Sequence, residues 1–201
     1  MLTKKILKFL LLVSINFCFI PNAFAIAPYL FVQETADAAS EALNKRMSKE
    51  EKMEQLKIIA KETVDIKGIG NYSLGTYRKT ISDQKKEEYF DIFEQYFLKS
   101  FASRLAEYTD PKIRVDSQKK LNDKYTMVSS TLLATSEKPE IKIDWRVVIK
   151  NPDNPLIIDV IIEGVSLAKV QREEFNSIIQ NNDGDIKALF SNLRQFINKK
   201  D

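Results

Sequence analysis

The chain of 201 residues carries a net charge of +3, one cysteine and no histidine. This length corresponds to one domain or at most two small ones, and a hydrophobic fraction of 44% with 29% charged residues is ordinary globular composition. Because histidine is absent, Ser-His-Asp and Cys-His catalytic arrangements and His-ligated zinc are excluded.

The first 25 residues are typical of a secretory signal. Three lysines lie within the first eight residues, an apolar run covers 9–20, and the small-x-small pattern Ala-Phe-Ala ends at Ala25. The apolar run has about a dozen residues, fewer than the roughly 20 that a membrane-spanning helix needs. We therefore expect cleavage after Ala25, and an uncleaved N-terminal anchor is the alternative interpretation.

Cleavage would change the charge balance of the remaining domain, residues 26–201. The removed segment holds three lysines, no acid and the only cysteine, so it would leave 28 basic and 28 acidic side chains out of 31 and 28. A secreted domain with no net charge and no thiol has no disulfide and must be stabilised by its core. Without a block of lysine or arginine, we expect no nucleic-acid partner.

The first half of this domain is predicted to be helical. Apolar spacing predicts a helix over 29–47, and Ser48 with Glu51 three residues later indicates a capping box for a second helix that ends before Gly68. Residues 68–75 hold three of the five glycines and predict a hinge or tight connection. The longest helix is expected over 83–108, with an aromatic stripe at three- and four-residue steps.

The second half is predicted to be rich in strands. Alternating apolar and polar residues followed by turn residues predict four strands, and two helices close the chain. The resulting fold class is α+β, with an antiparallel sheet of about four strands packed on a helical layer. The expected strands are 112–117, 125–135, 141–150 and 156–163, and the expected helices are 167–180 and 185–198.

Catalytic and metal-binding patterns are weak. Asp159 and Glu163 share one face of a predicted strand, but four strand residues separate them by about 13 Å, beyond the ~5–9.5 Å of paired glycosidase acids. The segment 181–185 lacks the spacing of a calcium loop. The remaining feature is apolar surface on the aromatic stripe and on the strand of Trp145. These surfaces either pack on each other or enclose a dry cavity for an apolar ligand.

Several segments resemble the MlaC family, also called the toluene-tolerance auxiliary family, and they occur in the family's order over residues 29–197. The most specific is the run Asp159-Val-Ile-Ile-Glu-Gly-Val-Ser-Leu167. Residues 58–68 depart from the family pattern, since they lack the expected Leu-Pro-Tyr-Val type segment. The other segments are Leu74-Gly-x-Tyr77, Glu88-Tyr-Phe-x-x-Phe-x-x-Tyr-Phe97, Asp144-Trp-Arg146, Arg172-x-Glu-Phe175 and Gly184-Asp-Ile-x-Ala-Leu189.

This resemblance implies a periplasmic phospholipid carrier that is not an enzyme. Such a carrier holds acyl chains between sheet and helices, leaves the head group outside, and needs no cofactor besides the phospholipid cargo. The implied partners are an outer-membrane lipoprotein complex and an inner-membrane ABC transporter whose lipid-binding subunit has an MCE domain. The system maintains the lipid asymmetry of the outer membrane, and we expect the carrier to be a monomer.

The resemblance and the apolar pattern together predict the residues that line the lipid pocket. Val165 is the strongest single candidate. Which residues of 156–163 face the pocket stays open, because a register slip of one residue exchanges the two faces of the strand. The predicted lining residues are Leu74, Tyr77, Phe90, Phe93, Phe97, Phe101, Trp145, Val147, Ile158, Val160, Ile162 and Val165.

Other interpretations remain open on the sequence. Arg146 and Arg172 are either salt-bridge partners at the sheet–helix junction or ligands of a lipid phosphate. A small-molecule enzyme that uses a buried Asp144 or Asp159 is an alternative function. A carrier of a different lipid, such as a hopanoid or a sterol-like molecule, is another.

Overall fold

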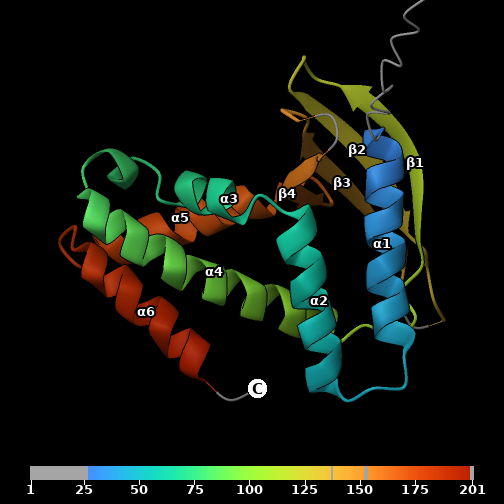
Figure 1. The fold of residues 1–201 in the computed structure, drawn as a ribbon, viewed down its shortest axis with the longest axis horizontal. Helices are drawn as coiled ribbons and strands as arrows, with labels where there is room; N and C mark the ends of the chain where they lie inside the picture. The colour runs from blue at the N-terminus through green and yellow to red at the C-terminus, as the bar shows by residue number, and fades with distance from the viewer. Residues whose placement is uncertain (1–26, 137, 152–153, 200–201) are drawn as a thin grey trace, which may run out of the picture.

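The computed structural model describes residues 27–136, 138–151 and 154–199, so the predicted signal segment 1–25 lies outside the described residues. Most helices gather on one side of the molecule, and a twisted sheet with the first helix along it forms the other (Figure 1). In the described part of the chain, no helix is long and apolar enough to cross a membrane. The helices are α1 (Pro28–Asn44), α2 (Lys49–Thr63), α3 (Ile66–Ser73), the short 3-10 helix η1 (Tyr77–Lys79), α4 (Asp83–Leu105), α5 (Leu167–Gln180) and α6 (Ile186–Asn198).

The sheet is antiparallel, and its strands are adjacent in chain order. This arrangement confirms the predicted α+β class and adds one short strand to the expected four. The added strand forms because the chain reverses at Glu163 and Gly164, whose φ angles are 48° and 81°, and this reversal pairs Val165 with Ile162. The strands are β1 (Ile113–Lys120), β2 (Tyr125–Leu132), β3 (Ile141–Val148), β4 (Leu156–Ile162) and β5 (Val165–Ser166).

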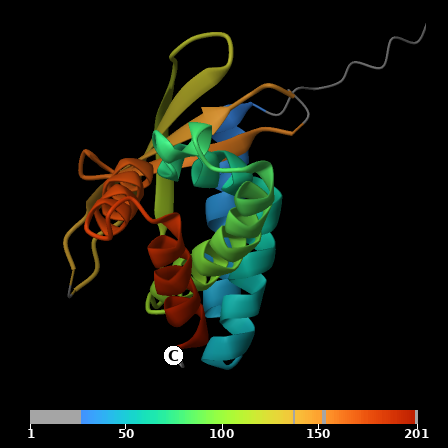
Figure 2. The ribbon, with the colours of Figure 1, turned by 90° about the vertical axis from the view of Figure 1, so that its left-hand side faces the viewer.

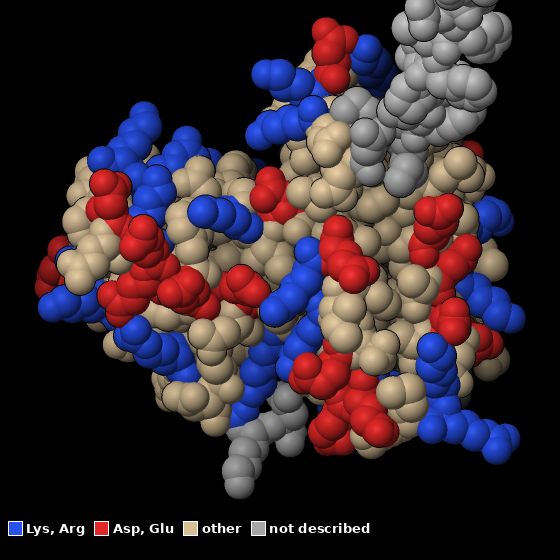
Figure 3. All heavy atoms as spheres, in the orientation of Figure 1, with Lys and Arg blue, Asp and Glu red and all other residues tan. Residues whose placement is uncertain are grey.

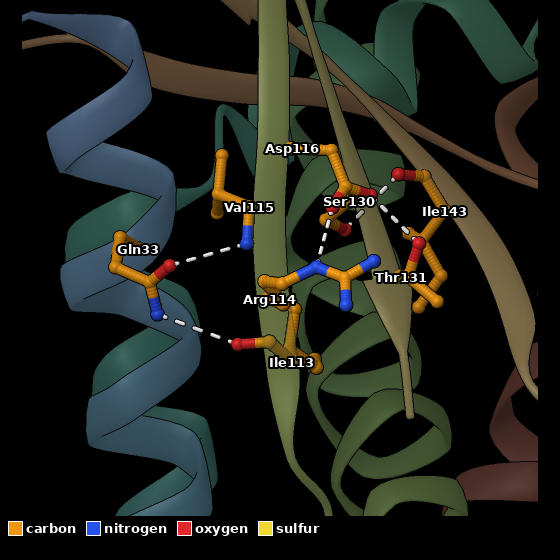
Figure 4. Close-up of polar contacts among 8 residues, drawn as sticks. All are labelled: Gln33, Ile113, Arg114, Val115, Asp116, Ser130, Thr131 and Ile143. Atoms are coloured by element: carbon orange, nitrogen blue, oxygen red, sulfur yellow. Dashed lines mark hydrogen bonds and ion pairs between the residues drawn. The ribbon is translucent and has the colours of Figure 1, made fainter. Parts of the chain in front are cut away.

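Helix α1 lies along the sheet, and the side chain of Gln33 bonds it to the outer edge of β1 (Figure 4). The backbone N–H of Val115 donates to Oε1 of Gln33 over 3.2 Å, and Nε2 of Gln33 donates to the carbonyl of Ile113 over 3.4 Å. An edge strand otherwise presents such groups to a further strand, so Gln33 protects this edge. Phe31 and Val32 of the same helix bury the sheet face, a role that the sequence interpretation missed.

Helix α4 is the centre of the helical layer, with α2, α3 and α6 packed against it (Figures 1 and 2). The predicted capping box of α2 is confirmed, because Ser48 Oγ accepts from the N–H of Glu51 and Glu51 Oε2 accepts from the N–H of Ser48. The aromatic side chains of α4 are the middle of the larger core. Val64, which follows α2, packs against both this core and the core of the sheet.

The prediction of a hinge over 68–75 is wrong, because most of this segment is the helix α3. Asp65 caps the helix by accepting a hydrogen bond from the N–H of Gly68 over 2.8 Å. Gly70 lies so close to the ring of Phe93 that a Cβ atom there would be 2.7 Å from Cδ1. Gly70 therefore serves close packing, and within 68–75 the turn is supplied by Gly75, which follows the helix and has a φ of 57°.

Candidate functional site

The six predicted lining residues from the helical half all belong to one apolar cluster, the helical-layer cluster, centred on α4. Leu74 and Phe93 are fully buried in it. Tyr77, Phe90, Phe97 and Phe101 pack against it and are partly exposed. Successive rings are in contact, with centroids of Phe93 and Phe97 at 6.0 Å and of Phe97 and Phe101 at 5.9 Å. This side of α4 therefore presents aromatic surface that its own layer does not cover completely.

Three of the six predicted strand residues belong to a second cluster, the sheet-face cluster, which also includes Phe31 and Val32 of α1. Val147 is completely buried, whereas Trp145 and Val160 are partly buried against it. Trp145 and Val160 are direct cross-strand partners and share one face. The indole N–H of Trp145 donates to Ser130 Oγ over 2.8 Å, so its polar atom is satisfied within the sheet.

Of the other three predicted strand residues, Ile162 and Val165 lie at the exposed end of the same face, and Ile158 lies at a register shift. Ile162 pairs with the buried Ile143 on one side and with Val165 on the other. Val165 is 53% exposed and Ile162 is 36% exposed. Ile158 is half-buried at the register shift that lies between the Val147–Ile157 and Arg146–Asp159 pairs. The register decides which residues of β4 face the apolar side of the sheet. Val160 and Ile162 share the face of Trp145, and Asp159 lies on the opposite face.

The two best-defined hollows in the described part of the chain lie away from these strand residues. One, of about 280 Å³, lies between η1 and the start of α6 and includes Tyr77 in its wall. The other, of about 630 Å³, follows the surface of α6 near Phe196. Tyr77 is the one predicted lining residue that borders either hollow. The rest are distributed over two apolar surfaces, which meet at Val64.

The polar residues of the most specific sequence run fix the junction of β4, β5 and α5. Asp159 is 3% exposed. Its Oδ2 accepts from Ser166 Oγ over 2.7 Å and lies 3.4 Å from Arg146, and its Oδ1 accepts from the N–H of Ala168 in the first turn of α5. The sequence had grouped Asp159 with Glu163, but Glu163 instead accepts from the N–H of Lys142 at 2.6 Å.

The second arginine that the sequence singled out, Arg172 on α5, contacts the end of α3. The guanidinium of Arg172 lies 5.1 Å from the ring centroid of Tyr72. A Cβ atom at Gly75 would lie 3.3 Å from Nε of Arg172. Two segments that are far apart in the sequence, 72–75 at the end of α3 and 172 on α5, therefore pack together through a cation–π contact.

Asp144, the other candidate for an enzymatic carboxylate, lies on the polar face of the sheet. It accepts a hydrogen bond from Ser129 Oγ over 2.6 Å. Its neighbours along β3 on the apolar face are Ile143 and Trp145. Neither Asp144 nor Asp159 therefore shares the apolar face, and within the described residues no group of three His, Cys, Asp or Glu side chains could hold a metal ion.

Two tyrosines in the helical-layer cluster have perturbed ionisation. Burial raises the pKa of Tyr89 far above its ordinary value, and its hydroxyl donates to the carbonyl of Gly70. Burial, followed by the nearby charge of Glu174, raises the pKa of Tyr96, whose hydroxyl donates to Gln171 over 3.0 Å. Both side chains are therefore neutral structural groups that connect α4 to α3 and α5.

These features define a two-layer α+β protein whose sheet and helices carry separate apolar surfaces that share one edge. The family model described as MlaC protein matches residues 33–195, which is most of the chain. The chain belongs to the MlaC family.

Two known proteins extend this comparison. A protein of Haemophilus influenzae named intermembrane phospholipid transport system binding protein MlaC is 28% identical over 102 residues, which are 48% of either chain. The match thus spans about half the length of this curated relative. The solved structure of a phospholipid-binding protein from Ralstonia solanacearum, in complex with a phospholipid, has the same fold. Its TM-score is 0.70 at 16% identity, over 84% of this chain and 96% of that one.

Proposed function

We propose that this chain is a periplasmic phospholipid carrier that holds acyl chains between the sheet-face and helical-layer clusters. The observation that carries the proposal is the row of apolar side chains on one sheet face. It runs from the buried Val147 through Trp145 and Val160 to the exposed Ile162 and Val165. Membership of the MlaC family and the phospholipid named for the Ralstonia solanacearum protein support the choice of ligand.

The physical need for a carrier follows from the cost of exposing acyl chains to water. A phospholipid with roughly 30 methylenes would cost about 24 kcal/mol, at about 0.8 kcal/mol each, if it crossed water unprotected. A protein pocket that is about as apolar as the bilayer makes the transfer nearly isoenergetic and therefore reversible. The direction of transport is then determined by the partners, and the carrier itself requires no catalytic residue.

Loading requires the two clusters to separate. The side chains that would line the site are packed within their own layers, and Val64 connects the layers at one edge. Acyl chains would enter beside Trp145 and Phe97, where both surfaces are only partly buried. On this model Arg146 keeps its role at the β4–α5 junction and the lipid phosphate stays at the surface.

The remaining expectations belong to the same proposal. The N-terminal segment would direct export and be cleaved after Ala25. The carrier would exchange lipid with an outer-membrane lipoprotein complex and with an inner-membrane ABC transporter that has an MCE-domain subunit. The protein would act as a monomer and would need no cofactor.

The first test is native mass spectrometry of the protein purified from a bacterial host, followed by extraction and identification of bound lipid. We expect a co-purified phospholipid. Absence of any lipid, under conditions in which a known carrier retains its cargo, would contradict the proposal. Extraction of a hopanoid or sterol-like molecule would instead assign the chain to a different lipid.

The second test uses two substitutions at valines of similar exposure. Val165→Glu places a charge in the proposed lipid site, whereas Val170→Glu places it on the outer side of α5, where Val170 is 46% exposed. Both positions are open to water, so each change should alter stability by no more than about 0.5 kcal/mol. We expect Val165→Glu to abolish lipid co-purification because a charge cannot be buried against acyl chains. Equal loading of both variants would contradict the assignment of Val165.

A further inference from the structure

The β1–β2 hairpin projects from the body of the molecule (Figure 2). The hairpin tip, residues 119–124, has three exposed lysines, Lys119, Lys120 and Lys124. Its one acid, Asp123, pairs with Lys120 at 2.7 Å. Figure 3 shows basic and acidic side chains together at the top of the molecule, where the hairpin ends, with the basic ones in excess. The tip therefore carries a local excess of positive charge.

Apolar side chains are exposed at the same end of the sheet. Leu121 is 43% exposed at the turn, and Tyr29 and Leu30 are exposed in the first turn of α1. The N–H of Tyr29 donates to Oε1 of Gln118 over 3.1 Å, so this helix end is fixed beside the outer part of β1. Lysines around exposed leucine and tyrosine are typical of segments that bind at a lipid–water interface.

The turn holds Leu121 at the surface through its own hydrogen bonds. Oδ1 of Asn122 accepts from the N–H groups of Lys124 and Tyr125, over 2.9 and 3.1 Å. The N–H groups of Leu121 and Asn122 both donate to the carbonyl of Tyr125. Four N–H groups of the turn are thus paired within it, which lowers the cost of bringing it to a less polar environment.

We propose that the hairpin tip, with the first turn of α1 beside it, binds transiently to an anionic membrane surface. Lipid phosphates accept from the three lysines, while Leu121 reaches the boundary with the acyl chains. An acidic protein surface would match the lysines but would offer no apolar environment to Leu121 and Leu30. Each lysine near an anionic surface increases binding about fivefold. A contact of three lysines, one of them paired with Asp123, is accordingly weak and reversible.

This proposal does not rest on lipid carriage, and the two are measured separately. The experiment is sedimentation of the purified protein with vesicles of phosphatidylglycerol and phosphatidylcholine, with pure phosphatidylcholine vesicles as the reference. The variant Lys119→Glu/Lys120→Glu/Lys124→Glu tests the tip. The matched control Lys49→Glu/Lys79→Glu/Lys187→Glu makes the same change in net charge at exposed lysines on α2, η1 and α6. Thermal unfolding checks that both variants are folded.

We expect the native protein and the control to bind anionic vesicles at low salt, and the tip variant to bind at least tenfold more weakly. Added salt should weaken binding because the contact is exposed. Leu121→Trp should show a blue shift of emission with anionic vesicles beyond that of the native chain, which has one tryptophan. Equal weakening of the tip variant and the control, or no vesicle binding by the native protein, would overturn the proposal. Binding to poly-glutamate without vesicle binding would overturn it in favour of an acidic protein.

Discussion

Asp159 is the residue whose surroundings best explain the most specific part of the sequence. Its carboxylate is buried, and it accepts from the hydroxyl of Ser166 and from the N–H of Ala168 while facing Arg146. An acidic side chain at a helix N-terminus satisfies a backbone donor and complements the helix dipole. Because Arg146 is substantially exposed, the two hydrogen bonds at the buried carboxylate contribute more than the ion pair.

Replacing Asp159 by alanine should therefore destabilise the fold. We expect a loss of about 2–4 kcal/mol in the free energy of unfolding, since Ser166 and the N–H of Ala168 lose their acceptor in a buried site. Asp159→Asn keeps one carbonyl acceptor and should cost roughly half as much. Urea denaturation measures both, with Asp123→Asn as the control, because Asp123 is 95% exposed and its loss should change stability by about 0.5 kcal/mol or less. Equal midpoints for Asp159→Ala and the control would show that this junction does not depend on Asp159.

At the scale of elements, α4 connects the helical layer through its two buried tyrosines. Because burial raises the pKa of Tyr89 and of Tyr96 above the ordinary value of 10.0, both stay neutral in the folded protein at pH values where they ionise in the unfolded chain. Their contribution to stability is thus fully present below about pH 10 and is lost as the pH rises through the folded-state values.

Alkaline titration, followed by the near-ultraviolet absorbance of tyrosinate, tests this connection. We expect a final step that coincides with unfolding, measured in parallel by circular dichroism. The Tyr89→Phe variant should lack part of that step, because its remaining buried hydroxyl is that of Tyr96. A native protein in which all seven tyrosines ionise before any loss of helix would contradict the buried roles of Tyr89 and Tyr96.

Element by element, the sequence predicts what local chemistry determines and misses what tertiary contact determines. Ser48 caps α2 as expected, and α5 begins and ends at the predicted residues. The helix α3 was missed because glycine has a low intrinsic helix propensity. Asp65 is a local N-cap signal that the interpretation overlooked. The contact between Gly70 and Phe93 is tertiary, and it cannot be read from the local pattern.

For the whole molecule, the candidate site is likewise predicted from sequence only as far as local pattern determines it. Alternation correctly places Trp145 and Val147 on one apolar face, because that face is needed for any packed sheet. It could not place Ile158, since the register shift in β4 depends on pairing with β3. Nor could it reveal that Phe31 and Val32 of α1 cover part of this face. The apolar surface that α1 does not cover, from Trp145 toward Val165, is consequently the part available to the lipid proposed above.

That arrangement makes Trp145 a reporter of loading, because it is the single tryptophan of the chain and lies between the buried and the exposed part of the sheet face. Loading with a phospholipid that carries bromine on its acyl chains should quench Trp145 emission strongly, since bromine quenches by contact. The same lipid without bromine should leave the emission of Trp145 unquenched. As a control, Trp145→Phe/Ile58→Trp moves the fluorophore to the outer side of α2, where Ile58 is 49% exposed, and should show little quenching. Equal quenching of both proteins would place the acyl chains elsewhere than between the sheet and the helical layer.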